Sequence, residues 1–181
     1  PAATTANGAW EREHLWPRSR GTGDTSACGF PHNDLHHLFP SEPDLNQSRG
    51  NLPFDDCAAP DCAVKGAGNR MRGGDDGAWE VWPGRRGDVA RAILYMDVRY
   101  EGGINTITGC SEPDLVVTDT REALITVPEV APTGAMGILA TLLRWHAEDP
   151  VDDGERRRNE VVERYQRNRN PFVDEPDLAC R

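Results

Sequence analysis

Lysine is almost absent from this chain, since Lys65 is the only lysine among its 20 lysine and arginine residues. Nearly all of the positive charge is therefore carried by guanidinium groups. A guanidinium is planar and can form two parallel hydrogen bonds to one phosphate or carboxylate, which a lysine ammonium cannot do. The composition thus favours a protein that binds such groups through arginine.

Long apolar segments are also absent. No run of about 18 apolar residues occurs, so we expect no membrane span. No internal repeat or low-complexity segment is apparent either. A chain of 181 residues is long enough for a real core, and its 18 glycines and 14 prolines indicate many loops around a small regular framework. We expect a monomer with one domain over residues 1–181.

The net charge of −10 counts against a protein that binds nucleic acid, because affinity for a polyanion depends largely on cationic contacts. The imbalance is local, however. Residues 102–154 carry two arginines and nine acidic residues, whereas residues 155–181 carry seven arginines and six acidic residues. We interpret the acidic middle as a face turned away from substrate. Arg156, Arg157 and Arg158 could line a phosphate track or equally form salt bridges. Low net attraction predicts modest affinity and strong inhibition by salt.

The five cysteines suggest an oxidising compartment, and their odd number leaves one unpaired. Cys57 and Cys62 flank a short loop and could close a small disulfide. The alternative is a zinc site that these two cysteines form with His36 or His37, although their spacing differs from the usual two-residue knuckle. The first residue is Pro1 rather than Met, so we expect that a leader was removed and that the protein is secreted.

A carboxylate, an imidazole and a carboxamide lie in two short segments rich in arginine. Glu13 and His14 are adjacent in EREHLWPRS, and Asn46 lies in DLHHLFPSEPDLNQSRGNLPF. Neutral imidazole can take a proton from water near neutral pH, and Mg²⁺ needs few protein oxygens because it keeps several waters. The set is suited to metal-assisted cleavage of a phosphodiester. Because neighbours on a strand point to opposite faces, we expect a bulge or a strand end at Glu13 and His14.

These segments resemble the endonuclease I family of non-specific nucleases, within the His-metal finger superfamily built on a beta-beta-alpha metal finger. Five separated motifs carry the resemblance: REHLWPRS at 12–19, DLHHLFP at 34–40, LNQSRGNLPF at 45–54, GDVARAILYMDVRY at 87–100, and the segment 142–176. Any one motif would be weak evidence, but their order and spacing together are strong.

The resemblance implies a metal-dependent endonuclease that hydrolyses DNA, and often RNA, with little regard to sequence and leaves 5′-phosphate ends. It implies that His14 is the general base and that Glu13 and Asn46 hold one Mg²⁺ or Mn²⁺ ion. A nearby arginine would steady the cleaved phosphate. The candidates for this role are Arg18, Arg20 and Arg49.

The expected fold is α+β, with a beta-beta-alpha metal finger at about 10–54 embedded in a mainly helical, loop-rich domain whose helical body spans about 85–181. The two strands and the short helix of the finger are expected near 12–16, 34–39 and 45–50. The segment 51–84 is expected to be loop, with Trp79 and Trp82 pinning it to the body.

Within the body, Asp88 is expected to cap a helix whose inward residues recur at helical spacing. These residues are Val89, Ile93, Met96 and Tyr100. Short strands are expected at 104–108, 115–118 and 124–127. A second buried helix stripe, ended by Pro150, consists of Ile138, Leu142 and Trp145. Asp152 and Glu155 have the spacing of a capping box for the next helix, and His146 is expected to be a packed helix residue.

Several candidate residues have a plainer interpretation. Asn46 could cap the short helix that Asp44 begins, instead of binding metal. His36 and His37 are adjacent in an expected strand, so only one should face the site, and a structural hydrogen bond is the alternative to a catalytic role for either. Asp34 is expected to brace its loop rather than to bind metal.

Two functions of different classes remain. The first is a secreted, metal-dependent, sequence-tolerant nuclease that acts on DNA and RNA. The second is a non-catalytic nucleic-acid-binding or zinc-stabilised module. The set Glu13, His14 and Asn46 favours the first, because a pure binder has no use for it. A toxin-type nuclease with a dedicated inhibitor protein is a third alternative. The sequence identifies no partner for His32.

Overall fold

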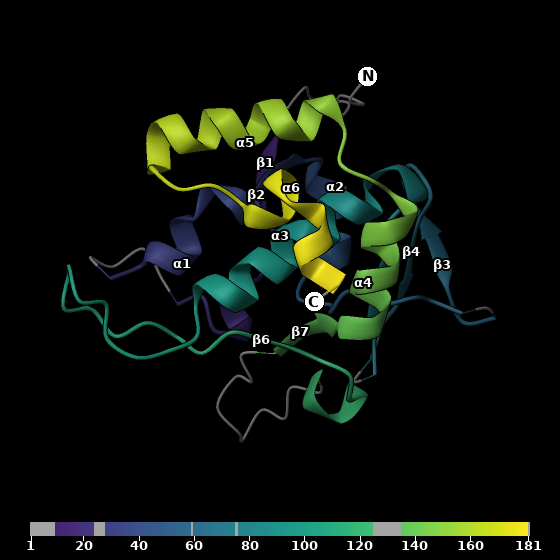
Figure 1. Cartoon of the computed structure of the whole chain (residues 1–181). Coiled ribbons are helices and arrows are strands. Elements are labelled where there is room, and N and C mark those ends of the chain that lie inside the picture. The colour runs from purple at the N-terminus through teal and green to yellow at the C-terminus, as the bar shows by residue number, and fades with distance from the viewer. Residues whose placement is uncertain (1–9, 24–27, 59, 75, 125–134, 181) are drawn as a thin grey trace.

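The computed structural model describes residues 10–23, 28–58, 60–74, 76–124 and 135–180. These residues form an α+β fold of helices and small sheets. Figure 1 shows α3 (Arg86–Arg99) in the middle, α5 (Asp153–Gln166) across the top and α4 (Leu139–Glu148) along one side. Among the described residues, no helix has the length and apolar character that crossing a membrane requires.

The first sheet places the candidate catalytic residues. β1 (Glu11–His14) pairs antiparallel with β2 (Leu38–Ser41), so that Glu13 lies opposite Phe39 and His14 opposite Leu38. Helix α2 (Pro43–Arg49) follows β2, close to the predicted 45–50. Because β1 ends at His14, the expected strand end is confirmed.

Short helical segments connect the two strands. The 3-10 helix η1 (Arg18–Arg20) and α1 (Phe30–Asn33) follow β1, and the 3-10 helix η2 (Leu35–His37) precedes β2. The prediction of a strand near 34–39 is therefore wrong at its start. The carboxylate of Asp34 accepts a hydrogen bond of 2.9 Å from the backbone N–H of His36, which favours a turn over an extended strand.

The prediction that the segment 51–84 is loop is wrong in part, because this segment contains a second sheet. β3 (Ala63–Lys65), β4 (Asn69–Arg72) and β5 (Ala78–Glu80) form three antiparallel strands in the order β3, β4, β5. Strands of three or four residues are too short for alternation to be visible in the sequence. Trp79 is buried and holds this sheet to the core, whereas Trp82 is 37% exposed, so only one of the two tryptophans has the expected role.

The core is built around α3, which begins just after the 3-10 helix η3 (Pro83–Arg85). Residues 87–96 are all buried, and α4, η2 and the short helix α6 (Pro171–Asp174) pack against them. The four residues predicted to face inward are buried, as expected. Asp88 does not cap this helix, because the helix begins two residues earlier and Asp88 lies in its first turn. At Gly87 an added Cβ would lie 1.9 Å from the Asp149 carbonyl oxygen, so a glycine is required there.

The predicted strands between α3 and α4 are only partly present. Residues 104–108 form no strand, because Ile104 makes only an isolated bridge with Ser111. A turn follows, in which the Asn105 side chain accepts hydrogen bonds from the backbone of Ile107 and Thr108. The strand at 115–118 is confirmed as β6 (Val116–Thr118), and it pairs in parallel with β7 (Ala135–Ile138). Leu124 belongs to the 3-10 helix η4 (Arg121–Leu124), and 125–127 lie outside the described residues.

The second buried helix is confirmed as α4, which ends before Pro150, although Ile138 belongs to β7. Helix α5 begins after Asp152, whose side chain accepts a hydrogen bond from the Glu155 backbone, so half of the predicted capping box is confirmed. The Glu155 side chain does not complete the box. It pairs instead with Arg91 of α3, through hydrogen bonds of 2.7 and 2.6 Å.

Two disulfides are present, Cys28–Cys110 and Cys57–Cys62, and Cys180 at the end of the 3-10 helix η5 (Pro176–Cys180) is free and exposed. The predicted small disulfide is confirmed. The zinc alternative is wrong, because a cysteine in a disulfide has no thiolate to offer a metal.

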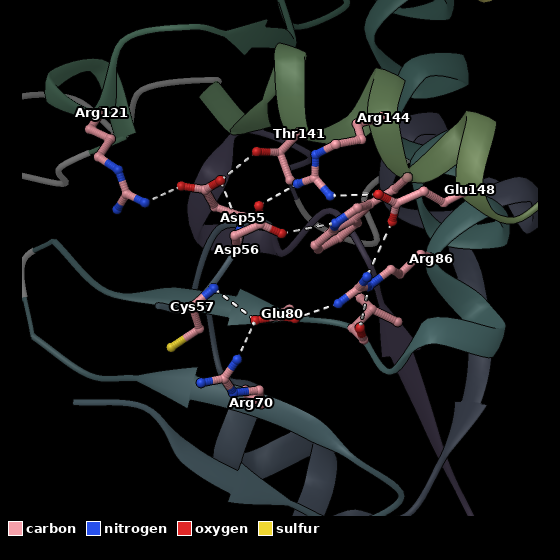
Figure 2. Close-up of polar contacts among 12 residues, drawn as sticks. Asp55, Asp56, Cys57, Arg70, Glu80, Arg86, Arg121, Thr141, Arg144 and Glu148 are labelled. Atoms are coloured by element: carbon pink, nitrogen blue, oxygen red, sulfur yellow. Dashed lines mark hydrogen bonds and ion pairs between the residues drawn. The ribbon is translucent and has the colours of Figure 1, made fainter. Parts of the chain in front are cut away.

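A polar network holds the segment after Phe54 to the helices (Figure 2). Asp55 accepts a hydrogen bond of 2.6 Å from Thr141 and contacts Arg121, while Asp56 contacts Arg144 and accepts one of 3.1 Å from the Trp145 indole. Below them in the figure, Glu80 accepts a hydrogen bond from the Cys57 backbone and pairs with arginines of β4 and α3. These acidic side chains are paired with arginines and hydrogen-bond donors of the protein itself, which indicates that they have a structural role.

Candidate active site

Glu13 and Arg49 lie buried at the bottom of the site. Glu13 points from β1 into the protein, and its Oε1 lies 2.9 Å from Nη1 of Arg49 on α2. The same guanidinium donates to the backbone carbonyls of His14 and Leu15 and lies over the Phe54 ring. Arg49 therefore locks the end of β1 onto α2 and fixes the position of Glu13.

The second carboxylate oxygen of Glu13 is different. Oε2 is buried, and no hydrogen-bond partner for it exists among the described residues. Burial raises the pKa of this carboxyl, although the charge of Arg49 lowers it. A buried, unpartnered carboxylate oxygen is costly, and a bound cation would remove that cost. The geometry thus fits a metal ion at Oε2.

Asn46 lies within α2, one turn before its end, and its Nδ2 donates a hydrogen bond of 2.9 Å to Glu11 of β1. This bond uses the amide nitrogen and leaves the amide oxygen as an acceptor or metal ligand. The alternative in which Asn46 caps the amino terminus of the helix is wrong, since the helix begins at Pro43 and its N-cap is Glu42.

His14 occupies the last position of β1, half-buried between two other imidazoles. The His32 ring stacks on it, with ring centroids 4.2 Å apart and an angle of 20° between the planes. The His37 ring meets it edge-on at 5.5 Å. Burial lowers the pKa of His14, and the charges of His32 and Arg12 lower it further, while backbone hydrogen bonding opposes the change. The neutral form, which can accept a proton, is therefore favoured.

His37 and His36 point to different surroundings, as expected for adjacent residues, although both are buried. Nδ1 of His37 accepts a hydrogen bond of 3.3 Å from the Trp16 backbone, and its carbonyl accepts one of 3.0 Å from Leu15. His36 packs against Tyr95, with ring centroids 4.4 Å apart. Of these two histidines, only His37 therefore contacts His14, the candidate general base.

Asp34 binds the loop before β2 to α3. Besides the His36 backbone, its carboxylate accepts hydrogen bonds of 2.8 and 2.9 Å from the hydroxyls of Tyr95 and Tyr100. Burial and the Asp34 carboxylate raise the pKa of both tyrosines, so their hydroxyls stay protonated and donate. These contacts are those of a bracing residue, which is the role that the sequence predicted for Asp34.

The three candidate arginines have different surroundings. Arg20 is buried and donates to the carbonyls of Asn51, Leu124 and Ala135. Arg49 is buried and bound to Glu13 and to backbone. Arg18 alone of the three is exposed, and with Pro17, Ser19, Gly50 and Asn51 it lines an open depression. Only Arg18 can reach a phosphate without breaking internal hydrogen bonds.

A family model described as Endonuclease I matches residues 2–177, almost the whole chain. The chain belongs to the endonuclease I family. It is 43% identical over 173 residues to an extracellular ribonuclease of Bacillus amyloliquefaciens and 42% identical over 173 residues to one of Bacillus subtilis (strain 168). Each match covers 95% of this chain and 53% of the relative, so the chain spans about half the length of these curated relatives.

Within this endonuclease I domain, sequence reasoning missed His32, Tyr95 and Tyr100 as parts of the site. His32 carried no signal, because it precedes β2 by six residues and reaches His14 only through the path of the connecting loop. Both tyrosines lie in the motif 87–100, where helical spacing identified Tyr100 as a core residue. A buried tyrosine hydroxyl usually needs a hydrogen-bond acceptor, and this rule could have linked the two tyrosines to Asp34.

The described residues contain no group of three or more His, Cys, Asp or Glu side chains arranged to hold a metal. The predicted ligand pair of this endonuclease I domain is of another kind, because it combines one carboxylate with one amide oxygen. Magnesium bound in this way completes its shell with water and substrate oxygens.

Proposed function

We propose that this endonuclease I domain is a metal-dependent, sequence-tolerant endonuclease that hydrolyses RNA and DNA to products with 5′-phosphate ends. One observation carries the proposal. A half-buried histidine ends the same strand on which the preceding glutamate has a buried carboxylate oxygen with no hydrogen-bond partner among the described residues. A base and an anionic ligand on adjacent residues supply two of the groups that cleavage of a phosphodiester needs.

Glu13 Oε2 and the Asn46 amide oxygen are the proposed ligands of one Mg²⁺ or Mn²⁺ ion. Two hard oxygen donors suit either ion and leave positions for the substrate. When bound, the ion stabilises negative charge on the phosphate and on the departing 3′ oxygen. Arg49 has a supporting part, since its ion pair fixes Glu13 Oε1 and directs the other oxygen away.

His14 is the proposed general base, which takes a proton from the attacking water. Burial lowers its pKa, which favours the neutral ring, and it directly follows Glu13 at the end of the same strand. A positioned base of this kind typically accelerates a reaction by about 10²–10⁴-fold.

Arg18 is the proposed phosphate contact. The depression that it lines joins the segment after β1 to the residues after α2, so a strand of nucleic acid in it would pass close to both catalytic segments. A free guanidinium can bind a phosphate through two hydrogen bonds. The contact is to backbone and not to base edges, which is consistent with cleavage at many sequences.

The relatives are named extracellular ribonucleases, which supports RNA as a substrate and secretion of this protein. Two disulfides fit an oxidising compartment. The family description supports endonucleolytic cleavage. We propose that the domain acts as a monomer and accepts both nucleic acids, because a phosphate contact and a metal ion distinguish them little.

The test is cleavage of supercoiled plasmid and of a structured RNA by the purified chain with Mg²⁺, with Mn²⁺ and with chelator. Glu13→Gln and Asn46→Leu are measured beside it, with Asp44→Asn as a control that removes an exposed charge of α2, two residues from Asn46. We expect cleavage with either metal, none with chelator, and 5′-phosphate ends. Both ligand variants should need more metal. Cleavage that persists in chelator would contradict the metal role, and a wild-type chain that cuts neither substrate would contradict the function.

A further inference from the structure

His32 lies against the candidate base. It belongs to α1, between the two strands, and its ring stacks on that of His14 with a centroid distance of 4.2 Å and a plane angle of 20°. On its edge, His14 meets His37, which is fully buried. Two neighbouring imidazoles therefore restrict the ring of the residue that ends β1.

We propose that His32 is a positioning residue, which holds the His14 imidazole in the orientation that accepts a proton from water. This inference rests on the proposed function. It assigns His32 no contact with the substrate and no proton of its own, only the stacking face against which His14 is set.

His14 needs such a support because of its place in the chain. As the last residue of a two-stranded sheet, it lacks neighbours on a third strand that would fix its side chain. A side chain with free rotation spends only part of its time in a productive geometry, and a misplacement of about 1 Å in an active site can cost about 10²-fold. A ring stacked at 4.2 Å, with the planes 20° apart, blocks rotation of the imidazole toward that face.

The segment that carries His32 is itself held at both ends. Before α1, Cys28 is joined by a disulfide to Cys110, which follows α3 in the chain. After α1, Asp34 is bound by the hydroxyls of Tyr95 and Tyr100. Pro31, beside His32, is buried. A rigid segment can orient a neighbouring ring, whereas a mobile loop could not.

The experiment uses four variants of the complete chain, assayed with Mg²⁺ on RNA and plasmid. His32→Ala and His32→Gln remove the ring. His32→Phe keeps a flat ring of similar size without its nitrogens. Phe30→Ala is the matched control, because it removes an exposed ring two residues away on the same helix. Melting temperature and kcat and KM are measured for each.

A second readout does not depend on activity. An aromatic ring shields the protons above its face, so stacking should shift the His14 ring protons upfield in the NMR spectrum of the metal-free protein. We expect that shift in the wild type and in His32→Phe, and its loss in His32→Ala and His32→Gln.

The proposal predicts that kcat falls by about tenfold or more in His32→Ala and His32→Gln, with KM unchanged, and stays near the wild-type value in His32→Phe and in the control. It is overturned if His32→Ala keeps the wild-type kcat, if only KM rises, or if His32→Phe is as impaired as His32→Ala. If the Ala and Gln variants melt too early to assay, His32→Phe decides the case, because it should keep both the wild-type kcat and the upfield shift, and the loss of either overturns the proposal. A wild type that cuts nothing defeats the proposed function and leaves the NMR result to judge the stacking alone.

Discussion

Arg49 and Glu13 form a buried ion pair, 2.9 Å between Nη1 and Oε1, that joins α2 to the end of β1. The pair uses one carboxylate oxygen, and the other has no hydrogen-bond partner in the part of the chain that the structure describes. Arg49 and Arg18, which lie in similar sequence contexts, therefore have different surroundings. Arg49 organises the site from within, and Arg18 faces the solvent from which substrate arrives.

Arg49→Ala should destabilise the fold by about 3–5 kcal/mol, because it leaves the Glu13 carboxylate buried without its counter-charge. Arg18→Ala should leave stability within about 0.5 kcal/mol, because the side chain is exposed, yet it should reduce cleavage. Urea unfolding and initial rates of RNA cleavage measure the two effects. An Arg49→Ala protein as stable as the wild type would contradict the bracing role, and an Arg18→Ala protein that is fully active would remove Arg18 from the site.

The buried ion pair between Arg91 of α3 and Glu155 of α5 should contribute far more to stability than the exposed pair of Arg144 and Glu148. Arg91 is 0% exposed, and Glu155→Gln leaves its charge without a full partner, which should cost about 3–5 kcal/mol. Glu148→Gln removes an exposed partner that Arg144 and Arg86 share (Figure 2). Each of these arginines keeps a second carboxylate, so the variant should cost less than about 1 kcal/mol. Equal losses in chemical unfolding of the two variants would show that burial does not set the importance of these pairs.

The two disulfides should stabilise the fold unequally. Cys28–Cys110 closes a separation of 82 residues, and Cys57–Cys62 closes one of 5. In the chain-entropy description the longer loop is worth about 4.5 kcal/mol and the shorter about 2 kcal/mol. Replacing each pair by serines and measuring melting tests this order. The reverse order would indicate that chain entropy does not determine how much each disulfide stabilises the fold.

His37 should make the fold sensitive to acid. Burial lowers the pKa of His37 from 6.5 to about 3, so between these values the unfolded chain takes up a proton that the folded chain does not. Stability therefore falls as the pH falls through this window, by up to about 1.4 kcal/mol per pH unit for this one group. His37→Gln keeps an acceptor for the Trp16 backbone and removes the titration. Its unfolding free energy should depend less steeply on pH between 6 and 4 than that of the wild type. Identical slopes would mean that His37 is not the group responsible.

The sequence predicted the parts of the fold that rest on long periodic patterns or on local chemistry. Helix α3 was recognisable from the spacing of Val89, Ile93 and Met96, and the start of α5 from Asp152. The sheet of β3, β4 and β5 was missed because each strand has only three or four residues. The turn at η2 was missed because a side chain, Asp34, and not the residues' strand propensity, decides the local backbone.

For the site, residue chemistry suggested Glu13, His14 and Asn46, and the family resemblance implied a role for each, which stays a prediction. Burial was the property that the sequence could not supply. It separates Arg18 from Arg20 and Arg49, all of which lie in similar polar contexts. The contact between His14 and His32 depends on the path of the seventeen positions between them, which no local pattern reveals.

The most direct test of the account is the initial rate of RNA cleavage by His14→Ala in Mg²⁺, compared with the wild type at equal concentration. His14 is only half-buried, at the end of β1, so the variant should still fold, and its melting temperature is measured beside the rate. The account predicts a rate at least about 100-fold lower with the fold intact. A folded His14→Ala protein that cleaves at the wild-type rate would contradict it.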